Sequence, residues 1–123
     1  MTPRRALVVD DDPQILEVLA MRLESMGLEV ATSTQPADVP SLLDTGFDLA
    51  LFDLRMTPMD GLALLQIARE RQPHLPVLIM TAHGSIDGAV EAIRNGAFDY
   101  LTKPFVREER LSLIHISEPT RPY

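Results

Sequence analysis

The 123-residue chain contains no cysteine and no tryptophan, and only 5% of its residues are aromatic. Without cysteine it forms neither disulfides nor thiolate metal sites, which fits a reducing, cytoplasmic location. No apolar run approaches the about 20 residues that cross a membrane, so no membrane association is expected. Basic residues are also scarce, with 11 Lys and Arg against 18 Asp and Glu and a net charge of −7. This balance argues against direct nucleic-acid binding by the segment.

Hydrophobic residues make up 46% of the chain, which is enough to pack the core of one domain of this length. Short apolar runs predict five strands, at residues 5–9, 28–32, 48–52, 76–80 and 98–101. Helical periodicity predicts helices between them, at residues 13–26, 37–45, 61–72 and 85–95. This alternation favours an α/β fold in which helices pack around a five-stranded parallel sheet.

The predicted helix boundaries carry typical capping residues. Asp12 and Pro13 suit the start of the first helix, and Gly27 suits its end. Asp60 and Gly61 open the 61–72 helix as a cap and turn. The core face of the first helix is expected to carry Ile15, Val18, Leu19, Leu23 and Met26.

Polar residues follow the apolar runs where the predicted strands end. They are Asp10, Asp11 and Asp12 after the first run, Asp53 after the third, Thr81 after the fourth and Lys103 after the fifth. Singly these residues have ordinary explanations, because aspartates cap helices, threonines form turns and lysines lie in solvent. Together they predict one site at the carboxyl edge of a parallel sheet, suited to a metal ion and a phosphoryl group.

In this order the residues resemble the receiver domain of bacterial two-component response regulators, over about residues 4–110. The motifs are VVDDD (8–12), DLRM and MDG within 53–61, TAHGS (81–85) and the doublet Lys103-Pro104. The stretch 84–105 further resembles receivers of the nitrogen-regulator class, which belong to transcriptional regulators. The resemblance implies a doubly wound, flavodoxin-like fold with strand order 2-1-3-4-5.

The resemblance also implies a role for each site residue. Asp53 would be the nucleophile that takes a phosphoryl group from a sensor histidine kinase. Mg²⁺ would be held by Asp10, Asp11, Asp53 and the backbone carbonyl of Arg55. Thr81 and Lys103 would each bind a phosphoryl oxygen. Such a protein catalyses only its own phosphorylation and dephosphorylation, and is not an enzyme in the usual sense.

Three further residues would tune the switch by the same resemblance. Tyr100 occupies the place of an aromatic residue that turns inward on activation, although a half-buried strand tyrosine is an equally good interpretation. Arg55 and His83 each lie two residues past a site residue and would set the lifetime of the phosphorylated state. One departure is that Pro58 stands one place later than usual in the loop after Asp53, which leaves the aim of the Arg55 carbonyl less certain.

The end of the chain departs further from the pattern. Residues 1–110 are expected to form the receiver domain, whose last helix would be truncated or irregular. Residues 111–123 (LSLIHISEPTRPY) resemble a translated sequencing-adapter read and are assigned no function. The 85–110 face would be the output and dimerisation surface. An incomplete last helix would expose Ile93, Leu101 or Val106 there and favour a homodimer.

Two other hypotheses compete with the switch. Asp10 and Asp12 also resemble the nucleophile and acid/base of haloacid-dehalogenase-type phosphatases, although Gln14 stands where those enzymes want Thr or Val. The chain could also be a receiver-like docking or dimerisation module that works without phosphorylation. The presence of Asp53, Thr81 and Lys103 together argues against such a module, which has no chemical need for all three.

Overall fold

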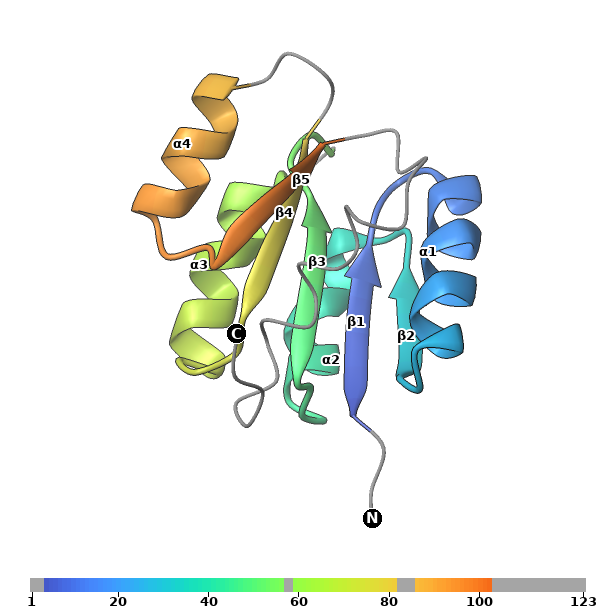
Figure 1. Ribbon diagram of the computed structural model, residues 1–123. Helices are drawn as coiled ribbons and strands as arrows, with labels where there is room; N and C mark the ends of the chain where they lie inside the picture. The colour runs from blue at the N-terminus through green and yellow to red at the C-terminus, as the bar shows by residue number, and fades with distance from the viewer. Residues whose placement is uncertain (1–3, 57–58, 82–85, 103–123) are drawn as a thin grey trace, which may run out of the picture.

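The computed structural model describes residues 4–56, 59–81 and 86–102 and is shown in Figure 1. Its strands are β1 (Arg5–Val9), β2 (Glu29–Ser33), β3 (Leu49–Asp53), β4 (Val77–Thr81) and β5 (Asp99–Thr102). Its helices are α1 (Pro13–Ser25), α2 (Val39–Leu43), α3 (Gly61–Arg71) and α4 (Ile86–Arg94), with a short 3₁₀ turn at Pro36–Asp38. The predictions for His83, Val106 and residues 111–123 fall outside the described residues.

The five strands form one parallel sheet in the order β2-β1-β3-β4-β5, as predicted. Among the described helices, α1 covers one face while α2, α3 and α4 lie on the other (Figure 1). Strand residues alternate between the two cores, so Leu7 and Val9 face α2 and α3 whereas Ala6 and Val8 face α1. No described helix is both long enough and apolar enough to cross a membrane.

Four strands begin and end one residue later than predicted, and only β1 matches at both ends. The prediction followed apolar side chains, whereas strand pairing depends on backbone hydrogen bonds and continues onto the next polar residue. Asp53 pairs with Met80, and Thr81 pairs with Thr102. Asp53 and Thr81 are therefore the last residues of their strands rather than the first residues of loops.

The predicted helix boundaries are confirmed at three points. The carboxylate of Asp12 accepts a hydrogen bond from the Gln14 amide at 2.9 Å, and Asp60 accepts one from Ala63 at 3.0 Å. Gly27 follows α1 with a φ of +94°, a conformation that favours glycine. The weakest predicted helix, 37–45, becomes the 3₁₀ turn followed by α2, which is only five residues long.

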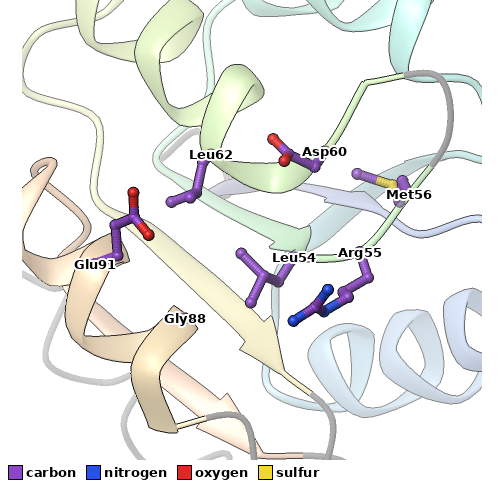
Figure 2. A pocket seen from close by; sticks show the side chains of 7 residues that line it. All are labelled: Leu54, Arg55, Met56, Asp60, Leu62, Gly88 and Glu91. Atoms are coloured by element: carbon purple, nitrogen blue, oxygen red, sulfur yellow. The ribbon is translucent and has the colours of Figure 1, made fainter.

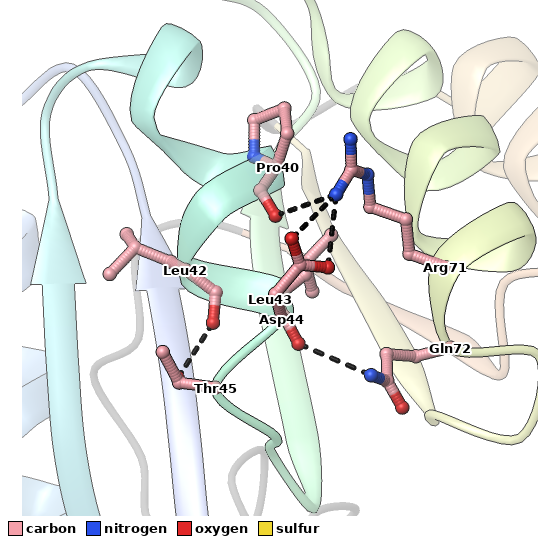
Figure 3. Close-up of polar contacts among 7 residues, drawn as sticks. All are labelled: Pro40, Leu42, Leu43, Asp44, Thr45, Arg71 and Gln72. Atoms are coloured by element: carbon pink, nitrogen blue, oxygen red, sulfur yellow. Dashed lines mark hydrogen bonds and ion pairs between the residues drawn. The ribbon is translucent and has the colours of Figure 1, made fainter.

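Two side chains at the end of α3 join this helix to α2. The Arg71 guanidinium forms an ion pair with Asp44 at 2.7 Å, and the Gln72 amide donates to the Leu43 carbonyl at 3.2 Å (Figure 3). The Arg71 pair is exposed to solvent, so its contribution to stability is modest.

Two predictions about burial are wrong. Val18 is 46% exposed, and Leu16 takes its expected place in the core because α1 turns a slightly different face to the sheet. Leu101 is only 2% exposed, because it pairs with Met80 of the neighbouring strand β4 and belongs to the buried cluster on the α1 side of the sheet. Ile93 is 43% exposed, as predicted.

Candidate functional site

An acidic cluster lies at the carboxyl edge of the sheet, where β1 and β3 end side by side. Asp10, Asp11 and Asp53 each offer a carboxylate oxygen, and these oxygens all lie within 4.8 Å of one another. The cluster forms because β1 and β3 are neighbours in register, with Val9 opposite Phe52. The chain therefore brings together three of the residues that the sequence predicted for one site.

The three carboxylates differ in exposure. Asp10 is completely buried and Asp53 is 6% exposed, whereas Asp11 is exposed to solvent. The Asp12 amide donates to Oδ1 of Asp10 at 2.9 Å, which fixes the turn between β1 and α1. A group of oxygen ligands that is buried on one side and open on the other suits a hard divalent cation that keeps some water.

Asp12 takes no part in this cluster. Its carboxylate caps α1, as predicted. An acid/base at this position would have to give up the cap, so the geometry speaks against the phosphatase hypothesis.

Thr81 ends the strand next to β3. It is 2% exposed and comes directly after Met80, the residue that pairs with Asp53. Its register partner Thr102 is the last described residue of β5. Lys103 follows Thr102 in the sequence but lies outside the described residues, as does His83.

Arg55 is exposed and, together with Leu54, lines a pocket of about 450 Å³ directly after the end of β3. The pocket lies between the segment after β3, the start of α3 and helix α4 (Figure 2). Arg55 and Glu91 stand on opposite sides of it, with Leu54 and Gly88 between them (Figure 2). The pocket thus lies between the end of β3 and helix α4, and α4 carries part of the predicted output face.

Tyr100 is 40% exposed on β5, in keeping with the interpretation of a half-buried strand tyrosine. Val90 and Ile93 on α4 and Phe98 just before β5 are also exposed apolar residues. Sequence reasoning missed two glycines that contact the segment after Asp53. Gly61 belongs to the MDG motif and opens α3, but the motif alone does not indicate its contact with β3, and no motif points to Gly88.

A comparison with known protein families assigns the class to which this fold belongs. Residues 6–115 match the response regulator receiver domain, so the chain belongs to that family. The chain is 45% identical over 123 residues to the DNA-binding transcriptional regulator NtrC of Klebsiella pneumoniae, in an alignment that covers 95% of this chain and 26% of that protein. The chain thus spans about a quarter of the length of this curated relative. The identity of 45% confirms the predicted likeness to the nitrogen-regulator class.

Solved structures show the same fold. The receiver domain of NtrX from Brucella abortus superposes with a TM-score of 0.87 at 32% identity, covering 94% of this chain and 99% of that one. The beryllofluoride-activated NtrC4 receiver domain dimer gives a TM-score of 0.85 at 33% identity, covering 92% of this chain and 94% of that one.

Proposed function

We propose that this domain accepts a phosphoryl group on Asp53 from a sensor histidine kinase, in a reaction that depends on Mg²⁺. The observation that carries the proposal is the acidic cluster, in which carboxylate oxygens of Asp10, Asp11 and Asp53 lie within 4.8 Å of one another. Hard oxygen ligands in this number and spacing fit Mg²⁺. The backbone carbonyl of Arg55, two residues past Asp53, would be a further ligand.

The reaction forms an acyl phosphate. A carboxylate oxygen of Asp53 attacks the phosphorus atom, the bond from phosphorus to the donor nitrogen breaks, and the histidine leaves with that electron pair. When bound, Mg²⁺ supplies positive charge that offsets the charges of the carboxylates and the phosphoryl oxygens. The Thr81 hydroxyl would donate to one phosphoryl oxygen and the Lys103 ammonium to another. Positioning and charge neutralisation are the main needs of phosphoryl transfer.

The new phosphoryl group adds about −1.5 to −2 charges at the sheet edge and biases two conformations of the output face. Tyr100 would take part in that change. Arg55 and His83 would flank the phosphoryl group and control the access of water. We expect Arg55→Ala and His83→Ala to change the rate of dephosphorylation, measured by the decay of the phosphorylated mass; unchanged decay in both would remove this role.

The proposal extends to the partners of the domain. The relative from Klebsiella pneumoniae is a DNA-binding transcriptional regulator, so we propose that this chain is the receiver part of a similar regulator, with residues 1–110 as the domain. We propose a homodimer as well, because α4 and the start of β5 carry the exposed apolar residues Val90, Ile93 and Phe98 and a related receiver has been solved as a dimer. A cytoplasmic location stays a prediction.

The decisive experiment incubates the chain with Mg²⁺ and acetyl phosphate and follows the intact mass. We expect one added phosphoryl group on the wild type, none without Mg²⁺ and none on Asp53→Asn. Peptide mapping then identifies the modified aspartate, because label on Asp10 would support the phosphatase hypothesis instead. A folded chain that binds no Mg²⁺ and takes up no phosphoryl group would favour the docking module.

A further inference from the structure

Gly61, the first residue of α3, lies directly against the backbone of the proposed phosphoacceptor. A Cβ atom added at Gly61 would lie 3.0 Å from the carbonyl carbon of Asp53 and 3.0 Å from Cα of Leu54. It would come still closer to the carbonyl oxygen of Asp53. All three contacts are backbone atoms at the end of β3, so no side-chain rotation relieves them.

The glycine is needed here for space rather than for backbone conformation. The described glycines with positive φ are Gly27, Gly46 and Gly96, and Gly61 is not among them. Its backbone conformation therefore suits any residue. What excludes a side chain is the close approach of α3 to β3.

The same contact closes the loop that leaves the acidic cluster. The Gly61 amide donates to the Leu54 carbonyl at 2.9 Å, and the Leu54 amide donates to the Met80 carbonyl at 2.8 Å. Leu54, the residue directly after Asp53, is thus held on both sides, with its amide bound to β4 and its carbonyl bound to the first residue of α3. Arg55, whose carbonyl is the proposed fourth ligand, is the next residue along this segment.

We propose that Gly61 is a positioning residue for the phosphoacceptor. By letting α3 approach the Asp53–Leu54 peptide, it sets where the Asp53 carboxylate stands relative to Asp10 and where the Arg55 carbonyl points. A methyl group there moves the end of β3 away from the start of α3 and spoils the ligand set. The inference rests on the proposed function, because it concerns the geometry of that site.

Gly88 on α4 provides a matched control. A Cβ at Gly88 would also lie too close to residue 54, but its partner is Cδ2 of the Leu54 side chain, at 2.5 Å. Figure 2 shows the Leu54 side chain next to Gly88, and both residues line the pocket. A leucine side chain can change rotamer, so Gly88→Ala leaves the backbone of β3 in place. The two variants make the same chemical change around the same residue.

The test measures Mg²⁺ affinity by calorimetry and the initial rate of phosphorylation by acetyl phosphate at saturating Mg²⁺, for wild type, Gly61→Ala and Gly88→Ala. We expect Gly61→Ala to weaken Mg²⁺ binding about tenfold or more and to slow phosphorylation. Mutations of groups that orient metal ligands lower metal affinity by a similar factor. Gly88→Ala should stay within about twofold of wild type in both measurements, because only a side chain must move. Wild-type values in a folded Gly61→Ala protein would overturn the inference. A wild type that binds Mg²⁺ but takes no phosphoryl group would instead overturn the proposed function, while the comparison of Mg²⁺ affinities still tests Gly61.

If Gly61→Ala does not fold, a second pair of variants tests whether the start of α3 positions the phosphoacceptor. Asp60→Ala removes the cap that holds the first turn of α3, whereas Asp60→Asn keeps a capping oxygen and removes the charge. We expect Asp60→Ala to bind Mg²⁺ several-fold more weakly than Asp60→Asn, since a loosened helix start no longer holds Gly61 against Asp53. Equal Mg²⁺ affinities in these two variants would refute the role of the helix start.

Discussion

The charged side chains at the two edges of the sheet are arranged differently. At the amino edge, arginines bind backbone carbonyls of the loops that lead into the strands. The Arg5 guanidinium donates to the Gly46 carbonyl at 2.6 Å and lies 4.5 Å from the centre of the Phe47 ring. Arg69 donates to the carbonyls of Pro73 and Leu75 before β4. Charge at this edge joins chain segments and serves stability.

At the carboxyl edge, three carboxylates gather instead. Oxygens of Asp10, Asp11 and Asp53 approach within 4.8 Å, and two of these residues are buried. Carboxylates this close repel one another, so the cluster gains stability when a cation joins it. This difference in charge arrangement indicates that the charged residues of the amino edge stabilise the fold, whereas those of the carboxyl edge bind a ligand.

Asp11→Asn should lower the Mg²⁺ affinity of the carboxyl edge without lowering the free energy of unfolding of the domain. Loss of one charged ligand should weaken Mg²⁺ binding by about a hundredfold, since even disturbing the groups behind metal ligands costs about 10- to 100-fold. Without Mg²⁺ the free energy of unfolding should stay equal or rise, because one repulsive charge is gone. Calorimetry and urea unfolding measure the two effects, with Asp12→Asn as the control that leaves the ligand set intact. Loss of stability without loss of Mg²⁺ affinity would contradict the contrast.

Mg²⁺ itself should stabilise the fold through this edge. At a free concentration of 100 times its dissociation constant, a ligand that binds only the folded state adds about 2.7 kcal/mol to the free energy of unfolding. Urea unfolding with and without Mg²⁺ measures this shift. Asp11→Asn should show a much smaller shift at the same Mg²⁺ concentration. Equal shifts in the two proteins would mean that the ion acts elsewhere.

Arg69→Met should reveal the stabilising role of the amino edge. Partial burial lowers the pKa of the Arg69 guanidinium, and its removal leaves two carbonyls without their donor. We expect the free energy of unfolding to fall by about 2 kcal/mol, with Mg²⁺ affinity unchanged. Arg71→Met is the matched control, because its exposed ion pair with Asp44 contributes at most about 1 kcal/mol. The prediction fails if the two variants are equally stable or if Arg69→Met loses Mg²⁺ affinity.

Asp12→Ala should show the smallest effect, although Asp12 lies next to the acidic cluster. Loss of the α1 cap should lower the free energy of unfolding by about 1 kcal/mol and leave Mg²⁺ affinity within about threefold of wild type. Asp12→Asn should restore most of the lost stability, since asparagine also caps helices. Chemical unfolding and calorimetry distinguish this result from a role of Asp12 as a ligand, which would weaken Mg²⁺ binding in both variants.

Much of the architecture could be predicted, because local patterns arise from local geometry. Apolar runs and helical periodicity located every described strand and helix, and Asp12, Asp60 and Gly27 marked helix ends. The predicted strand ends were one residue short at Asp53 and Thr81 because backbone pairing ignores side-chain polarity. The site followed from the general rule that parallel strands bring their carboxyl ends to one edge.

The order of strands, helices and polar strand ends along the chain is enough to indicate which residues could meet. How closely these residues approach one another depends on the packing of the folded chain. Burial of Leu101, exposure of Val18 and the contact of Gly61 with the backbone of Asp53 all depend on how elements pack across the fold. The physical reason is that periodicity reports the geometry of one element, whereas distances between elements are set by the shapes of both surfaces in contact.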